Sequence, residues 1–321
     1  MPRLSRVQAA ACQLLIFVLA LGLGALPGVA NDLDQQLRDQ YQGKTLVLRG
    51  FYPGNSLRYD SAGSPSEGGL SGDWTVDGVV RIDEIRASGD RLKIRATRVH
   101  LGWVGGELQT LHDSVKDKFD KDEKKDRELR IEAPLGSGGT TESAVAALSQ
   151  IFLTSQDSFA ELVPDYWKPC VRAGLGAGLG ADTEIKKPWC HFSAEFLAIP
   201  GVAPHLNSQA DSEPAQDSSQ DAASDGPFHP GKGISPPKVL QQTDPEFSEA
   251  ARRSKFQGTV TLSLVVDTSG AATDIRILHP VGSGLDAQAV RAVKTWKFRP
   301  GAKDGQIVRV EVAVETDFHL F

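Results

Sequence analysis

Two cysteines and a neighbouring histidine are the residues with the clearest chemistry in this chain. Cys170 and Cys190 would close a loop of about 20 residues, and His191 follows the second cysteine directly. Removal of a leader that contains Cys12 would leave these two cysteines as a pair. A pair of cysteines in an exported protein forms a disulfide most simply, and this one would stabilise the fold by roughly 3 kcal/mol. The alternative is a metal site that includes His191, but CxxC spacing is missing. We therefore predict a disulfide and expect no metal or other cofactor.

The sequence contains no recognisable catalytic motif. Its histidines are scattered, neither GxSxG nor HExxH occurs, and no pair of carboxylates stands out from the charged background. The glycines of Gly174–Gly180 alternate, but the segment follows no predicted strand and lacks the Lys-Ser/Thr of a phosphate-binding loop. We interpret it as a loop inside the disulfide. The expectation is that the protein is not an enzyme.

A strand of regular alternation closes the chain. Its valines fall on one face and its charged residues on the other, which is the period-2 pattern of a half-buried strand; the run is Ile-Val-Arg-Val-Glu-Val-Ala-Val-Glu at 307–315. The backbone of such a strand at the edge of a sheet can bind an extended segment of another chain as one more strand. Two roles remain open for this edge, a binding site or simply the end of the sheet, protected by Arg309 and Glu311.

The elements that must position this strand follow from the patterns before it. A helix is predicted from the cap Asp244-Pro245, and Gly258 opens a strand that leads through the turn Asp267–Gly270 into a second strand. Spacings of three and four predict another helix over Leu285–Trp296, and the last strand runs over Gln306–Phe318. The inward-facing residues are Val260, Leu262, Leu264, Val266, Ile275, Ile277, Leu285, Ala289, Val293 and Trp296. The order α-β-β-α-β predicts a three-stranded antiparallel sheet packed against two helices.

The N-terminus has the composition of a targeting segment. Arg3 and Arg6 precede the apolar run Leu14–Leu26, and small residues before Asn31 predict signal-peptide cleavage there. An uncleaved inner-membrane anchor is the alternative. We therefore expect an exported, periplasmic protein. The formal charge of −6 and the lack of a basic stripe with aromatics make nucleic acid an improbable partner.

Composition divides the 321 residues into five parts. After the leader (1–30) we predict a β-rich domain (31–135), with strands within Thr45–Phe51, Trp74–Ile85, Asp90–Leu101 and Glu128–Ala133. A helical segment with the disulfide loop follows (136–205), then a disordered linker rich in Ser, Ala, Asp, Gln and Pro (206–235), and the C-terminal domain (236–321). The predicted fold class is α+β.

The C-terminal part resembles the C-terminal domain of TonB-type energy transducers. The matching motifs are Phe247-Ser-x-x-Ala-Arg252, Gly258-Thr-Val, Val265-Val-Asp-x-x-Gly270, Leu285-Asp-x-x-Ala289, Ala292-Val-x-x-Trp-x-Phe-x-Pro300 and the closing Val-x-Val-x-Val strand. The resemblance implies binding of a short periplasmic segment of an outer-membrane transporter, the TonB box, as an added strand. Carried over to this chain, it implies a partner-binding set of Phe247, Ser248, Arg252, Gln306, Val308, Arg309, Val310, Glu311 and Val312.

The chain departs from the transducers outside this domain. Its leader has no His that could couple to an inner-membrane motor, and its linker has no Pro-Lys or Pro-Glu repeats. Two hypotheses follow: a periplasmic TonB-family protein that binds an outer-membrane partner, with energy transduction if the leader is retained, or an envelope structural or ligand-binding protein that uses the domain for attachment. Strand exchange between two copies would give a homodimer.

Overall fold

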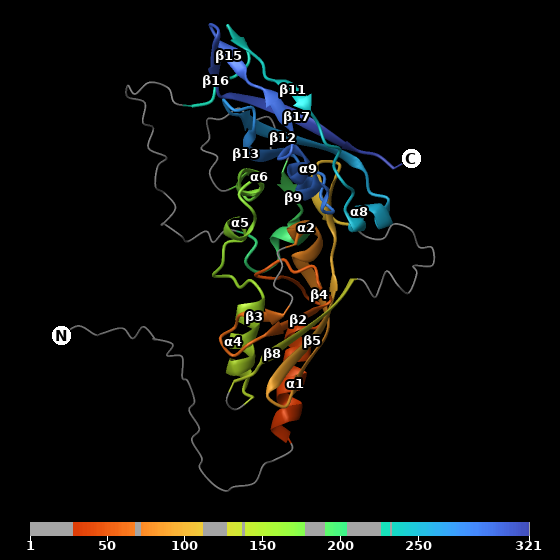
Figure 1. Cartoon of the computed structure of the whole chain (residues 1–321). Coiled ribbons are helices and arrows are strands. Elements are labelled where there is room, and N and C mark those ends of the chain that lie inside the picture. Colours follow the sequence, from red (N-terminus) through yellow and green to blue (C-terminus); the bar gives the residue numbers. More distant parts are fainter. Residues whose placement is uncertain are drawn as a thin grey trace, which may run out of the picture.

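The computed structural model describes residues 28–67, 72–111, 127–136, 139–176, 190–203, 226–231 and 233–320. The predicted apolar leader run, the linker up to residue 225 and most of the predicted glycine-rich loop lie outside these ranges. Within the described ranges, no helix combines the length and apolar character that crossing a bilayer requires. In Figure 1 the N-terminal sheet occupies the lower half of the molecule and the C-terminal sheet the upper half.

The N-terminal sheet has six strands in the order β1-β4-β5-β8-β2-β3. All neighbours are antiparallel except β2 and β8. The strands are β1 (Thr45–Val47), β2 (Ser56–Tyr59), β3 (Pro65–Glu67), β4 (Val79–Ser88), β5 (Arg91–Arg98) and β8 (Glu128–Pro134). The prediction of a strand beginning at Trp74 is wrong, because Trp74–Asp77 forms the short helix α2, whose first turn is capped by the Asp73 side chain.

Two helices cover one face of the N-terminal sheet and build the first hydrophobic core. Helix α4 (Thr141–Ile151) is capped by Thr140, whose side chain accepts a hydrogen bond from the Ser143 amide. Helix α1 (Gly28–Tyr41) was not predicted from the sequence, although Leu33 and Leu37 lie one turn apart and are both buried. The burial of these two leucines against the sheet is what makes this otherwise polar helix stable.

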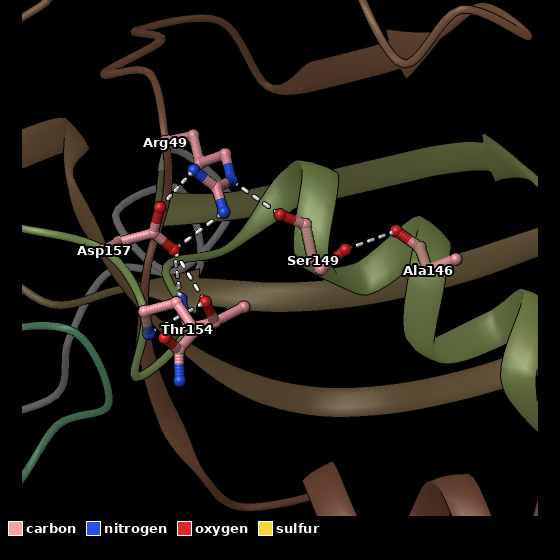
Figure 2. Close-up of polar contacts among 6 residues, drawn as sticks. Arg49, Ala146, Ser149, Thr154 and Asp157 are labelled. Atoms are coloured by element: carbon pink, nitrogen blue, oxygen red, sulfur yellow. Dashed lines mark hydrogen bonds and ion pairs between the residues drawn. The ribbon is translucent and has the colours of Figure 1, made fainter.

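Arg49 connects the N-terminal core to the segment that follows α4 (Figure 2). Arg49 follows β1, and its guanidinium donates two hydrogen bonds of 2.7 Å to the Asp157 carboxylate and one to the Ser149 carbonyl at the end of α4. Asp157 also accepts from the amide and hydroxyl of Thr154. A bidentate arginine–carboxylate pair fixes orientation as well as distance. It therefore sets the direction in which the chain leaves α4.

The next segment consists of short helices and the disulfide. It contains α5 (Phe159–Leu162), α6 (Lys168–Gly174) and α7 (Ala194–Leu197), together with the small sheet β6-β7-β9, formed by β6 (Leu101–Val104), β7 (Glu107–Thr110) and β9 (His191–Phe192). Cys170 in α6 and Cys190 before β9 are joined as predicted, with their Cα atoms 5.4 Å apart. The disulfide therefore ties α6 to this small sheet.

The C-terminal sheet is antiparallel with the order β13-β12-β17. The predicted α-β-β-α-β order is present as α8 (Glu249–Ser254), β12 (Gly258–Val266), β13 (Ala272–His279), α9 (Leu285–Val293) and β17 (Val310–Phe318). Four residues of β12 that were predicted to face inward are almost fully buried: Val260, Leu262, Leu264 and Val266. Around this sheet lie two smaller ones, β10-β15-β16 and β11-β14, with β10 (Ile234–Ser235), β11 (Lys238–Gln241), β14 (Lys297–Arg299), β15 (Gly301–Lys303) and β16 (Gln306–Val308).

The second hydrophobic core is shared by the two halves of the chain. Three tryptophans from the N-terminal half, Trp74, Trp103 and Trp167, contact one another with ring centroids 5.2–6.1 Å apart. They belong to one buried cluster with the inward face of β12 and with α9. Burial of large aromatic side chains is a major source of folding free energy. The C-terminal domain is therefore packed into the molecule rather than held only by the linker.

Candidate partner-binding edge

The backbone of β17 is bonded to β12 on one side only. The two strands pair over their whole length, from Val266 opposite Val310 to Gly258 opposite Phe318. Because successive residues of a strand direct their N–H and C=O groups to opposite sides, only every second residue of β17 bonds to β12. We define the β17 edge as the outward backbone groups of the others, at residues 309, 311, 313, 315 and 317.

The opposite edge of the sheet is covered by the N-terminal half. The amide of Ile277 in β13 donates a 3.0 Å hydrogen bond to the carbonyl of Tyr166, just before α6. Beyond β13, the Trp103 amide of β6 donates to the Val281 carbonyl (2.8 Å), and the Ser283 amide donates to the Leu101 carbonyl (2.7 Å). One amide of β13 and two backbone groups of the loop that follows it are therefore bonded to the N-terminal half.

One residue of the predicted linker already occupies part of the β17 edge. Phe228 forms a parallel bridge with Val310: its amide donates to the Arg309 carbonyl (2.8 Å), and its carbonyl accepts from the Glu311 amide (2.7 Å). The half-buried ring lies 4.8 Å from the ammonium of Lys303. Apart from this bridge, no strand in the described part of the chain pairs with the outer side of β17.

Phe247, Ser248 and Arg252 lie around the start of α8. The ring of Phe247 packs edge-on against Phe318 with centroids 5.5 Å apart. Ser248 is buried and is the N-cap of α8, accepting from the Ala251 amide at 3.0 Å. The predicted helix start at Asp244 is therefore wrong, because Ser248 also donates to the Ser283 carbonyl and this tertiary bond fixes the cap there. Arg252 is exposed and lies 3.8 Å from Glu249.

The predicted last strand is divided in two. Gln306 and Val308 belong to β16, which pairs with β15 in a hairpin, so the prediction of one continuous strand from Gln306 is wrong. The turn Asp304-Gly305, in which both residues have positive φ (52° and 84°), folds β16 back onto β15. The strand that pairs with β12 begins only at Val310.

The other predicted partner-binding residues do lie at the start of β17. Val310 is buried and Val312 half-buried on the inner face. The side chains of the two charged residues lie over the outer face of the sheet: Arg309 pairs with Asp274 at 3.0 Å, and Glu311 accepts from the Ser263 hydroxyl at 2.5 Å. Their backbone groups on the edge are those that Phe228 holds.

Farther along β17 the outward residues are exposed and acidic. Ala313, Glu315 and Asp317 are all exposed, and Asp317 accepts from the Thr259 hydroxyl of β12 at 2.5 Å. A segment bound here would lie beside two carboxylates. This stretch, 313–317, and Phe228 were not among the predicted site residues. The exposed stretch follows from the same alternation that predicted the strand, whereas Phe228 lies in a segment whose composition indicated only a linker.

The structure gives no metal-binding alternative in the described ranges, where no three His, Cys, Asp or Glu side chains gather closely enough to hold an ion. What the β17 edge offers is a row of backbone N–H and C=O groups, which can form hydrogen bonds.

Comparison with known proteins assigns the C-terminal domain. Residues 243–320 match the family described as the Gram-negative bacterial TonB protein C-terminal. The chain is similar to the protein tonB2 of Pseudomonas aeruginosa, with 35% identity over 82 residues that make up 25% of this chain and 30% of that protein. It is also similar to the protein TonB of Vibrio cholerae, with 32% identity over 86 residues, 26% of this chain and 35% of that protein.

Among solved structures, the solution NMR structure of the Pseudomonas aeruginosa TonB C-terminal domain matches 28% of this chain and 90% of that chain, with 23% identity and a TM-score of 0.24. The matched region spans about a third of the length of the curated relatives. The family match falls on the elements α8 to β17, the part of the chain that forms the C-terminal sheet. Residues 243–320 of this chain therefore belong to the TonB C-terminal domain family.

Proposed function

We propose that this chain is a periplasmic TonB-family protein whose C-terminal sheet binds an extended segment of an outer-membrane transporter along the β17 edge. One observation carries the proposal: β13 and the loop after it bond to the N-terminal half, while the outward groups of residues 313, 315 and 317 have no strand beside them in the described part of the chain. An exposed sheet edge is a template for another strand. Backbone hydrogen bonds would supply affinity, and the guest's alternate side chains would supply selectivity.

The charges along the edge predict which guest fits. Glu315 and Asp317 are exposed on the face that a guest's side chains would share. Opposite charges on neighbouring strands stabilise the pair by about 0.2–1 kcal/mol, and like charges destabilise it. We infer that the guest is neutral or basic at the positions beside these two carboxylates.

The Phe228 segment competes with the guest for the first part of the edge. A guest that pairs only with residues 313–317 leaves the Phe228 bridge in place, while one that extends to Arg309 must displace it. Displacement lowers the apparent affinity by the fraction of molecules in which the edge is open. The same edge, paired with a second copy, would give the strand-exchanged homodimer.

Energy transduction is the stronger form of the proposal and depends on the leader. A retained leader would anchor the chain in the inner membrane, where a motor can act on it; a chain that begins at Asn31 would be a periplasmic adaptor. The intact mass of the protein from its native envelope distinguishes the two forms.

The second candidate function is an envelope structural or ligand-binding protein that uses the domain for attachment. The core shared by the two halves favours it, because it makes the N-terminal half and the C-terminal sheet one packed structure.

The experiment that tests strand addition uses two variants at one exposed position. Ala313→Pro removes an outward N–H that β12 does not use, and Ala313→Ser keeps it. Labelled peptides that copy the periplasmic N-terminal segments of outer-membrane transporters from the same genome are titrated into the full chain, and binding is followed by fluorescence anisotropy. We expect binding to be equal for wild type and Ala313→Ser and at least tenfold weaker for Ala313→Pro. Equal binding by the Pro variant, with unchanged circular dichroism, would contradict strand addition at this edge.

A further inference from the structure

A cleft of about 770 Å³ lies where the N-terminal half meets the two helices of the C-terminal domain, α8 and α9. None of its lining residues belongs to β17, so the cleft is separate from the β17 edge. In Figure 1 the elements around it, α2, α8 and α9, lie near one another at the junction of the two halves. Volumes of roughly 300–1,000 Å³ are typical of small-molecule sites, which occur preferentially at junctions between domains.

Positive charge dominates the lining of the cleft. Five cationic side chains and three carboxyl groups line it: Arg98, Arg127, Arg253, Arg291 and Lys294, against Asp73, Asp77 and Glu249. An excess of one sign of charge in a concave, partly desolvated site raises the local concentration of ligands of the opposite sign.

Each carboxyl group has a partner within the protein. Asp77 lies 3.4 Å from the buried Arg98 guanidinium. Asp73 accepts from the Thr75 amide at 2.8 Å as the cap of α2, and Glu249 lies 3.8 Å from Arg252. Arg98 and Arg253 are thus paired with carboxylates of the cleft, and Arg127 lies against His100, so the two remaining cations of the lining are Arg291 and Lys294.

The surroundings of His100 show that several positive charges act inside the cleft. Its Nδ1 lies 3.1 Å from the guanidinium of Arg127, and since arginine only donates, the imidazole accepts and is neutral. Burial, followed by the charges of Arg127, Arg98 and Arg253, lowers the pKa of His100 to about 3. Three arginines from different segments thus act on one ring.

Two cations of α9 are placed to contact a ligand. Arg291 and Lys294 are three residues apart, both line the cleft and both are exposed. Neither forms an ion pair with any residue that the structure describes. Apolar groups, including Val76, Val290 and Tyr166, line the cleft as well.

We propose that this cleft binds a small ligand bearing a phosphate or carboxylate group, held by Arg291 and Lys294, with its apolar part against Val76 and Val290. Guanidinium and ammonium groups are the side chains suited to oxyanions, the first as a planar fork and the second as a point charge. The volume fits a small molecule or one lipid headgroup. The shared chemistry is the oxyanion, and the experiment separates its two sources.

The test is calorimetric titration of the full chain with two probes: sn-glycerol 3-phosphate as the free oxyanion, and phosphatidylglycerol vesicles as the headgroup, with phosphatidylcholine vesicles as the uncharged reference. The variants are Arg291→Gln and Lys294→Gln, both at exposed positions where folding is not at risk. The matched control is Lys297→Gln, an exposed cation of the same domain that does not line the cleft.

We expect one probe to bind and each cleft variant to weaken binding at least tenfold, while Lys297→Gln binds as wild type does. Binding of the soluble phosphate identifies a free ligand, and binding of phosphatidylglycerol vesicles alone identifies a lipid headgroup. Failure of both probes, or equal weakening by Lys297→Gln, would overturn the proposal. Peptide binding at the β17 edge is measured on the same variants, so that failure at one site is distinguished from failure at the other.

Discussion

The C-terminal sheet has two edge strands, β13 and β17, and the rest of the chain contacts them very differently. At β13, an amide bonds to the carbonyl of Tyr166 and the following loop pairs with β6. At β17, only Phe228 from the linker pairs with the outer side among the described residues, and residues 313–317 stay exposed. Edge strands in native proteins are usually covered, charged or shortened. This difference between the two edges supports the proposal that β17 binds a partner.

The largest effect on stability is expected from a proline at position 312 of β17, compared with a proline at the neighbouring position 313. The backbone N–H and C=O of Val312 point toward β12, where Val312 lies opposite Leu264. The backbone N–H and C=O of Ala313 point away from β12. Val312→Pro should lower the free energy of unfolding by roughly 3 kcal/mol or more, because it removes a ladder donor inside the sheet. Ala313→Pro should leave stability within about 1 kcal/mol of wild type. Urea unfolding measures both, and equal losses would contradict the assignment of the two sides.

Substitution of Gly282, in the loop that follows β13, should lower the free energy of unfolding almost as much. Gly282 has φ +90°, and a Cβ there would lie 2.5 Å from the Gly102 Cα and 2.6 Å from the Leu101 carbonyl. Gly282→Ala should therefore cost roughly 3 kcal/mol, from backbone strain and from the clash with β6. The control is Gly305→Ala, which has φ +84° but nothing within 4 Å, and should cost only about 1 kcal/mol. Similar losses in the two variants, measured by urea unfolding, would show that β6 does not lie against this loop.

The stability that Asp286 gives to the loop after β13 should depend on pH. Asp286 is buried and accepts from the amides of Val281 and Gly282, the loop that pairs with β6. Burial raises the pKa of this carboxyl to about 7, above an unfolded value near 4. The folded chain then binds more protons than the unfolded chain between these values, so Asp286 contributes less stability as pH rises from about 4 to about 7.

Other buried groups also make stability depend on pH: the raised pKa of Asp73 acts in the same direction, and the lowered pKa of His100 acts in the opposite direction. The difference in unfolding free energy between wild type and Asp286→Asn isolates the contribution of Asp286. The stability advantage of wild type over Asp286→Asn should be larger at pH 4 than at pH 8. Parallel stability curves across that range would show that the carboxyl stays ionised in the fold.

The smallest effect is expected at the open side. Phe228→Ala removes the ring that lies over Lys303 and should weaken the segment that competes for the edge. Stability should fall by only about 1 kcal/mol, while a guest that extends to Arg309 should bind about threefold more tightly. Peptide anisotropy measures the gain, with Tyr41→Ala in α1, which packs on the N-terminal core, as an aromatic control away from the edge. Tighter binding in the control as well, or weaker binding in Phe228→Ala, would show that Phe228 supports the guest instead of competing with it.

The sequence predicted the C-terminal domain well because its signals are local. Alternation placed Val260 to Val266 in the core, spacing placed α9, and the Asp267–Gly270 turn joins β12 to β13. The disulfide followed from the two cysteines that remain once the predicted leader with Cys12 is removed. The division of the last strand at Arg309 was missed because the valine alternation continues through it, although the Asp304-Gly305 turn is a strong hairpin signal for the pairing of β15 with β16.

The contacts that distinguish the two edges could not be predicted. They join backbone groups of residues that are far apart in the sequence, such as Tyr166 with Ile277, and backbone atoms carry no side-chain signal. Helix α1 was missed for a different reason: its two leucines, Leu33 and Leu37, follow directly on a leader-like segment. Phe228 lies in a stretch without hydrophobic periodicity, so only the fold shows that it reaches β17.

Site-specific photo-crosslinking from both edges tests the central claim most directly. Benzoylphenylalanine is placed at Ala313 on the β17 edge and, as the matched position, at Leu278 of β13, which is 41% exposed. Cells of the native host are irradiated and the products are identified by mass spectrometry. The account predicts a crosslink from 313 to an outer-membrane transporter and none from 278. Equal crosslinks from both positions, or a product from 278 alone, would contradict it.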